Sequence, residues 1–156
     1  MINELKILKE IRDRFNTDFM RVAEEIGHAS GENPNFNIDE FSDLSPADQL
    51  AKSDEFGLIN IINTSYQTQD TLERAMIQTI SLAVQVVIID RGDIAKQISI
   101  ARMALVEIVQ KSDFDFMRYA GLDLSSTEPT QLEFQGPGDN NCYFLVGIVL
   151  QLKIGI

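Results

Sequence analysis

Few residues in this chain combine the type and the spacing that chemistry requires. His28 is its only histidine and Cys142 its only cysteine. A zinc site needs several such ligands at short, fixed spacings, and a catalytic triad would have to recruit His28 from a loop, so neither chemistry is indicated. A single cysteine also excludes an internal disulfide. We predict that His28 is solvated at a helix end and that Cys142 is a small buried hydrophobe in an apolar strand.

Carboxylates offer the other chemical possibility. Asp113 and Asp115 could form an acid–base or metal-binding pair, but no further ligand stands at a defined spacing, so a solvated pair is favoured. The Gly-Pro-Gly run at 136–138 lacks the lysine and the following helix of a phosphate-binding loop. We therefore predict no catalytic, cofactor-binding or metal-binding residue and no enzyme activity. A rival enzymatic site would lie in the loops around Arg91, Asp113, Asp115 and Asp139.

The charge of the chain is strongly negative and unevenly distributed. The chain holds 24 acidic and 13 basic residues, for a net charge of −11, and residues 27–70 contain eight acids with Lys52 as the one lysine or arginine. Because no Lys/Arg cluster exists, direct binding to nucleic acid or to an anionic membrane is disfavoured. No apolar run approaches the ~20 residues of a membrane span, and no signal peptide is present, so we expect a cytoplasmic protein.

The first predicted element is a helix over residues 2–26, followed by a long acidic loop at 27–55. Asn3 is placed to cap this helix and Gly27 to end it. The loop is expected to be largely solvated, with a short helix starting at Ser45-Pro46. The apolar stripe of the long helix consists of Leu5, Leu8, Ile11, Phe15, Phe19, Val22 and Ile26. Apolar anchors in the loop are Phe36, Ile38, Phe41 and Leu44.

Two long strands are predicted next, one over residues 56–69 and one that runs from a turn at Asp70-Thr71 to Ile89. Both alternate with the period of a strand that buries one face. We join them in one β-hairpin of about a dozen residues per arm, which exceeds the usual strand length and would project beyond the domain body. A single helical turn at 70–77 is the alternative. The face assigned to the first strand consists of Phe56, Leu58, Ile62, Thr64 and Tyr66.

A strand–turn–helix follows and gives the clearest folding pattern in the sequence. Arg91-Gly92 forms the turn, and the carboxylate of Asp93 is placed to cap an amphipathic helix that runs to Lys111. Residues 113–126 are expected to form a wrapping loop with one helical turn. A second hairpin at 132–154 closes the chain, and its last strand is apolar enough to be central in a sheet or covered by a neighbouring subunit.

These elements predict one α+β domain over residues 1–156. A four-stranded mixed, mainly antiparallel sheet in the order α-ββ-α-ββ carries both helices on one face. The other face is not wholly polar, because it holds Tyr143, Leu145 and Val149. An apolar contribution of this kind indicates a surface for a partner.

In the order of these elements, the chain resembles the tail terminator, or tail completion, proteins of long-tailed bacteriophages. The features that carry the resemblance are the helix at 2–26, the hairpin at 56–89, the crossover helix at 93–111 and the terminal hairpin at 132–154. The resemblance implies a virion structural protein, made in the host cytoplasm, that forms a homohexameric ring. Such a ring caps the tail tube and joins it to the neck.

In that reading, subunits join by their sheet edges or by the exposed sheet face, and the hairpin or the acidic loop contacts tube or neck proteins. DNA would pass an acidic lumen without specific binding, because like charges repel phosphate. Two alternatives remain. The chain could be an acidic adaptor or immunity-type protein that binds a basic protein, or a small ligand-binding or enzymatic α+β domain.

Overall fold

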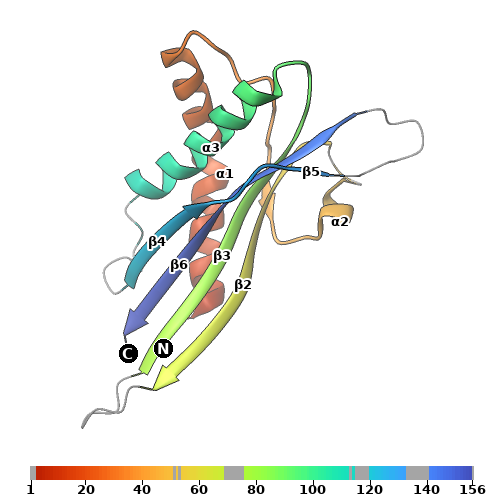
Figure 1. Ribbon diagram of the computed structural model, residues 1–156. Helices are drawn as coiled ribbons and strands as arrows, with labels where there is room; N and C mark the ends of the chain where they lie inside the picture. The colour runs from red at the N-terminus through yellow and green to blue at the C-terminus, as the bar shows by residue number, and fades with distance from the viewer. Residues whose placement is uncertain are drawn as a thin grey trace.

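The computed structural model describes residues 3–50, 52, 54–68, 76–112, 114, 120–132 and 141–155. Over these residues it confirms the α+β class, with three helices and one mixed sheet of six strands (Figure 1). The helices are α1 (Glu4–Ala29), α2 (Pro46–Leu50) and α3 (Ile94–Lys111). The strands are β1 (Phe41–Ser42), β2 (Phe56–Thr68), β3 (Met76–Ile89), β4 (Ala120–Ser126), β5 (Thr130–Leu132) and β6 (Tyr143–Gly155).

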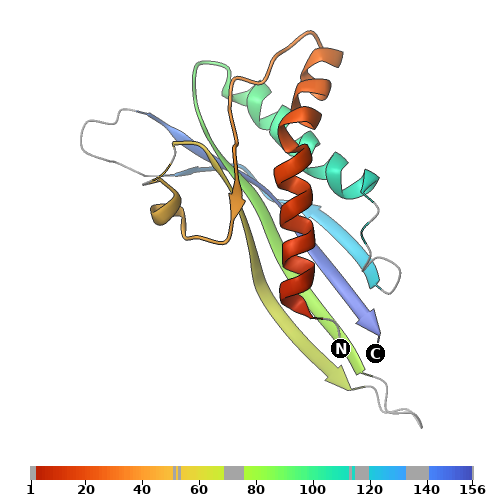
Figure 2. The same ribbon diagram turned by 180° about the vertical axis from the view of Figure 1, so that it is seen from behind.

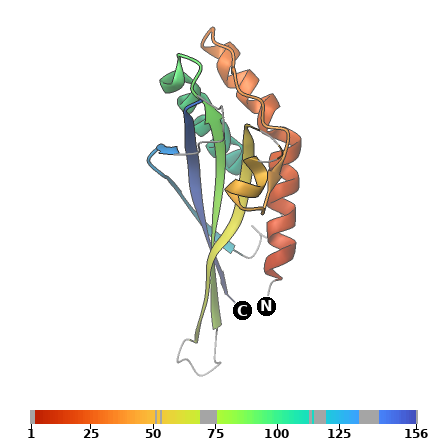
Figure 3. The same cartoon turned by 90° about the vertical axis from the view of Figure 1, so that its right-hand side faces the viewer.

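The sheet is built around three long strands. Its order is β1-β2-β3-β6-β4, and β5 also pairs with β6. The β2–β3, β3–β6, β4–β6 and β5–β6 pairs are antiparallel, and only the short β1–β2 pair is parallel. The predicted hairpins are therefore present. The β2–β3 hairpin extends past the first turn of α1, as Figure 3 shows.

The predicted count of four strands was wrong, because two further strands form in segments expected to be loops. β4 lies within 113–126, where we predicted a wrapping loop. Leu122 and Leu124 alternate with Gly121 and Asp123, and this period lets β4 pair with β6 and half-bury both leucines. β1 forms inside the acidic loop. Residues 70–75, 113 and 115–119 lie outside the described residues, and with them any helical turn there; Met76 and Ile77, the last two residues of the 70–77 choice, belong to β3.

A β-bulge at Ile62 corrects the predicted face of β2. Ile61 pairs with Leu82 while Asn63 pairs with Ser81, so Ile62 has no partner in the ladder. One extra residue reverses the alternation beyond it. Phe56 and Leu58 therefore lie on the opposite face of the sheet from Thr64 and Tyr66, although all four share one parity in the sequence.

Helix α1 has the predicted cap at Asn3, but it starts two residues later and ends three residues later than predicted. The side chain of Asn3 accepts hydrogen bonds from the backbone N–H groups of Leu5 and Lys6 and caps the helix. Gly27 does not end it. A Cβ there would stand 2.7 Å from the carbonyl oxygen of Glu32, so glycine is needed where the chain folds back against the helix. The left-handed residue after the helix is Gly31, with φ of 72°.

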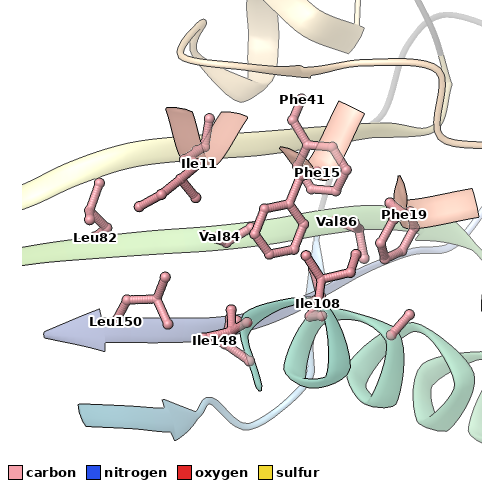
Figure 4. Packing of buried hydrophobic residues seen from close by; sticks show 14 of the residues in the cluster. Ile11, Phe15, Phe19, Phe41, Leu82, Val84, Val86, Ile108, Ile148 and Leu150 are labelled. Carbon is pink, nitrogen blue, oxygen red and sulfur yellow. The ribbon is translucent and has the colours of Figure 1, made fainter. Parts of the chain in front are cut away.

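Helices α1 and α3 pack on the same face of the sheet, as predicted (Figure 2). Side chains from both helices and from β3 and β6 meet in one continuous core, part of which Figure 4 shows. One predicted member of the stripe is absent from it. Leu5 is 71% exposed, and Ile7 is buried in its place. The central core residues are Ile11, Phe15, Phe19, Leu82, Val84, Val86, Ile108, Ile148 and Leu150.

The acidic loop is more ordered than a solvated connection. Phe36, Ile38 and Phe41 are buried, and the ring of Phe41 lies 5.3 Å from those of both Phe15 and Phe19. These anchors insert one edge of the loop between α1 and the sheet. The short helix α2 forms where expected, and the Ser45 hydroxyl accepts from the backbone N–H of Asp48 at 3.2 Å.

Candidate functional surfaces

Of the residues that the sequence offered for chemistry, the structure describes His28, Cys142 and Arg91. His28 is exposed in the last turn of α1, as predicted. Cys142 was expected to be buried and is exposed, because it precedes the first residue of β6 and the core begins one residue later. Asp113, Asp115, Asp139 and the run 136–138 lie outside the described residues. Among the residues that are described, no group of three or more His, Cys, Asp or Glu side chains could hold a metal ion.

Arg91, the remaining candidate, is held in a structural ion pair with Glu55. Its guanidinium donates to both carboxylate oxygens of Glu55, at 2.8 and 3.0 Å, and to the carbonyl of Asn35 at 2.9 Å. Glu55 also accepts from the backbone N–H of Ile89 and is 7% exposed. The hydrogen bond to Glu55 raises the pKa of Arg91, although partial burial opposes the shift.

A second polar group lies beside this pair. Asp93 was expected to cap α3 with its carboxylate, but it makes no side-chain cap bond. Its two oxygens instead accept from Asn35 at 2.6 Å and from Gln97 at 2.9 Å. Gln97 in turn accepts from the backbone N–H of Asn35 and donates to the carbonyl of Asn33. The Asp93 carboxylate therefore binds the loop and the side chain of Gln97, and not the free backbone N–H groups at the start of α3.

We call these five residues the polar latch: Asn35, Glu55, Arg91, Asp93 and Gln97. The latch fastens the acidic loop to the turn between β3 and α3. Its hydrogen bonds join residues that are 36 to 62 positions apart in the sequence. The one exception is the local bond between Gln97 and Asp93. No local pattern in the sequence indicates such long-range partners. Arg91 and Asp93 are therefore both engaged within the protein.

Shallow grooves follow the outer side of the helix layer. One, of about 350 Å³, is lined by Ile26, Met103 and Val106 together with Arg102, Glu107 and Gln110. A second, more polar groove lies between α1 and the end of α3. Its arginine and lysine side chains are paired with carboxylates on the same helix, as in Arg21 with Glu25 and Lys111 with Glu107. This pairing is typical of a solvated helix face.

The strand β2 has an unpaired side over most of its length. β1 covers it at Gly57 and Leu58, and no described strand pairs with it beyond Ile59 (Figure 1). We call residues 61–68 the free edge of β2. The free edge contains no charged residue and no proline. Two of its side chains are large and exposed, namely Ile62 at 58% and Tyr66 at 49%.

The sheet face opposite the helices has two parts. Near the turn to α3 it is apolar, with a buried cluster of Phe56, Leu58, Val87, Ile89 and Tyr143. Further along it is polar and nearly free of charge. The side chains there include Asn63, Ser65, Gln67, Thr79, Ser81, Gln85, Val149 and Gln151, with one acid, Asp123, and one base, Lys153. The negative charge of the chain therefore lies mostly outside the sheet.

The exposed acids gather on the loop that the latch holds. Asp39, Glu40, Asp43, Asp48 and Asp54 are all exposed. Two other acids of the loop are neutralised: Glu55 by Arg91, and Glu32 by Lys96 at 2.9 Å. The hydrogen bond from Lys96 to Glu32 raises the pKa of Lys96. The loop thus presents an acidic surface of defined position rather than a freely moving acidic tract.

In the part of the chain that the structure describes, neither long helix is apolar enough over a sufficient length to cross a membrane. We compared the chain with protein-family models and with curated proteins. Neither comparison found a match to this chain.

Proposed function

We propose that this protein is a ring-forming structural subunit of the tail terminator kind, which caps a phage tail tube and joins it to the neck. The observation that carries the proposal is the arrangement of the sheet. Its helices cover one face, while the polar part of the other face and the free edge of β2 carry exposed or half-buried side chains that are almost uncharged. A sheet with an open face and an open edge has surfaces suited to neighbouring subunits.

The placement of charge supports the same proposal. Copies with a net charge of −11 repel one another unless their contacts avoid the acidic surfaces. The sheet offers contacts with little charge, and the acidic loop lies away from them at the other end of β2. In a ring, an acidic wall would let DNA pass without binding, because it repels the phosphates. The projecting β2–β3 hairpin is a suitable contact for a tube or neck protein.

The decisive experiment is native mass measurement of the purified protein, combined with electron microscopy of the same sample. We expect a homohexamer and rings with six-fold symmetry, together with binding to tail tube protein from the same phage. A monomer that persists at high concentration and does not bind tube protein would contradict the proposal.

The exposed acids of the loop favour a second candidate, an adaptor that binds a basic protein. In that case the protein would bind one basic partner in a fixed ratio and form no ring. Replacing Asp39, Glu40 and Asp43 by Asn, Gln and Asn would then weaken binding and reduce its dependence on salt, since each removed charge removes a screened attraction. The same triple variant should leave ring assembly intact if the first proposal is correct.

A further inference from the structure

In the described part of the chain, no strand other than β3 pairs with the free edge of β2. Natural sheets guard their edges with charged side chains, prolines, very short strands or bulges. Residues 61–68 carry neither charge nor proline, and the one bulge, at Ile62, is followed by a regular ladder from Asn63 to Thr68. The backbone N–H and C=O groups on this side thus remain available for another strand.

Exposed apolar side chains concentrate at the same place. Of the four large hydrophobic side chains exposed among the described residues, Ile62 and Tyr66 lie on the free edge. A third, Leu5, lies in the first turn of α1, and its neighbour Glu4 accepts a hydrogen bond of 2.9 Å from the Tyr66 hydroxyl. The fourth, Met103, is on α3. An incoming strand would cover Ile62 and bring its own side chains against this turn.

A second free edge lies at the other side of the same sheet. β4 pairs with β6 on one side, and no described strand pairs with it on the other. Its seven residues include one charge, Asp123. This length fits the eight residues of the free edge of β2. Each copy of the chain thus carries both partners of a possible strand pair.

Strand directions are compatible with joining these edges. β2 is antiparallel to β3, β3 to β6 and β6 to β4, so β2 and β4 run in opposite directions within one sheet. When copies are placed side by side with their helix layers on the same side, β4 of one copy runs antiparallel to β2 of the next. The alternation then continues across the junction without interruption.

We infer that β4 of a second copy of this chain docks on the free edge of β2 and continues the sheet from subunit to subunit. Charge favours this occupant, because the two edges together carry one charged residue in chains that otherwise repel one another. A β2–β4 contact uses two different surfaces, so it propagates head to tail and closes into a ring when the rotation permits. The inference rests on the proposed ring and names the surface that would build it.

Cross-linking between two single-cysteine proteins tests the pairing. Both proteins carry Cys142→Ser, which removes the exposed native thiol; one adds Ser65→Cys on β2 and the other Ser125→Cys on β4. Both engineered positions face away from the helices and are exposed. A short bis-maleimide should join them, because opposed Cβ atoms in an antiparallel pair lie about 5 Å apart and the reagent tolerates a slip in register. In the matched control, the second protein carries Ser99→Cys on α3 in place of Ser125→Cys on β4.

The edge is then blocked by Ile62→Lys, with Met103→Lys as the matched control. Both side chains are exposed, at 58% and 47%, so neither change removes a core contact. Covering an unpaired lysine is unfavourable, so we expect Ile62→Lys to lower the yield of the 65–125 product by about tenfold or more. The product should be unchanged in Met103→Lys.

Several results would overturn the inference or separate it from the proposed function. Six-fold rings that persist in Ile62→Lys without a 65–125 product overturn the edge pairing but leave the proposed function standing. A dominant 65–65 product also overturns it, because it indicates a two-fold β2–β2 contact. A 65–125 product in open chains that bind no tube protein supports the pairing and overturns the proposed function. If the 65–125 product and the ring are both absent, the edge pairing and the proposed function are both overturned.

Discussion

Arg91 donates two parallel hydrogen bonds to Glu55, a carboxylate that is only 7% exposed and that precedes it by 36 residues. The pair connects the end of the acidic loop with the turn that follows β3. Two backbone N–H groups, of Asn37 and Ile89, point at the same carboxylate. Glu55 therefore connects the acidic loop with the end of β3 and the turn after it, and the position of the loop depends on these bonds.

Removing the guanidinium of Arg91 should destabilise the protein more than removing the exposed ammonium group of Lys111. In Arg91→Ala the buried carboxylate of Glu55 loses its charged partner, and we expect a loss of about 2–3 kcal/mol in the free energy of unfolding. This is below the 3–5 kcal/mol of a fully buried pair, because the Arg91 side chain is 41% exposed. Urea unfolding measures it. Lys111→Ala, which breaks an exposed pair with Glu107, should cost about 0.5 kcal/mol or less.

Gly57→Ala should test how closely the loop packs on the sheet. A Cβ at Gly57 would stand 2.5 Å from the ring carbon Cγ of Phe41, so the ring must move from its place beside Phe15 and Phe19. We expect a loss of about 1–3 kcal/mol, as for other overpacked sites. Gly121→Ala on β4 is the control, because nothing lies within 4 Å of its added Cβ. Equal effects of the two changes would contradict this packing.

Truncation of α1 side chains should separate its buried from its exposed face. Phe15 is fully buried against Phe41, with ring centroids 5.3 Å apart, and Phe15→Ala should cost about 3–5 kcal/mol. Leu5→Ala should change stability by about 0.5 kcal/mol or less, since Leu5 is largely exposed. Thermal or urea unfolding of the two variants measures both. A large effect of Leu5→Ala in the isolated subunit would show that the first turn of α1 is packed differently.

The hydrogen bond between Tyr66 and Glu4 should be visible in a pH titration. Donation to the Glu4 carboxylate, aided by desolvation and by the negative charge, raises the pKa of Tyr66 above its ordinary value of 10.0. Folding thus favours the neutral phenol. The resulting stabilisation is complete below pH 10 and is lost as the pH rises through the raised pKa.

Tyrosinate absorbance measures this titration, and Tyr66→Phe identifies which transition belongs to Tyr66. We expect Glu4→Ala to move that transition to lower pH, because the acceptor and the charge are both removed. Glu24→Ala, which removes another exposed glutamate of α1, should leave the transition in place. A transition that does not move in Glu4→Ala would show that the Tyr66–Glu4 bond is not formed in solution.

Local sequence patterns determined most of the elements. The stripe of α1, the alternation of β3 and β6, and the caps at Asn3 and Ser45 depend on residues within a few positions of one another, so the helices and hairpins could be predicted. The predicted α+β class and the placement of both helices on one face followed from them. No chemical site could be predicted with support, because no candidate ligand or nucleophile had partners at a defined spacing in the sequence.

Only the tertiary structure decided the rest, because it depends on residues far apart in the chain. The bulge at Ile62 appears only when β2 is paired with β3, and it reverses the face of Thr64 and Tyr66. Asp93 accepts a hydrogen bond from Asn35 instead of capping α3, because the loop brings the side-chain amide of Asn35 within 2.6 Å of its carboxylate. β4 becomes a strand because β6 offers it an edge. That same pairing leaves β4 and the free edge of β2 as the open sides of one sheet, which no local pattern could reveal.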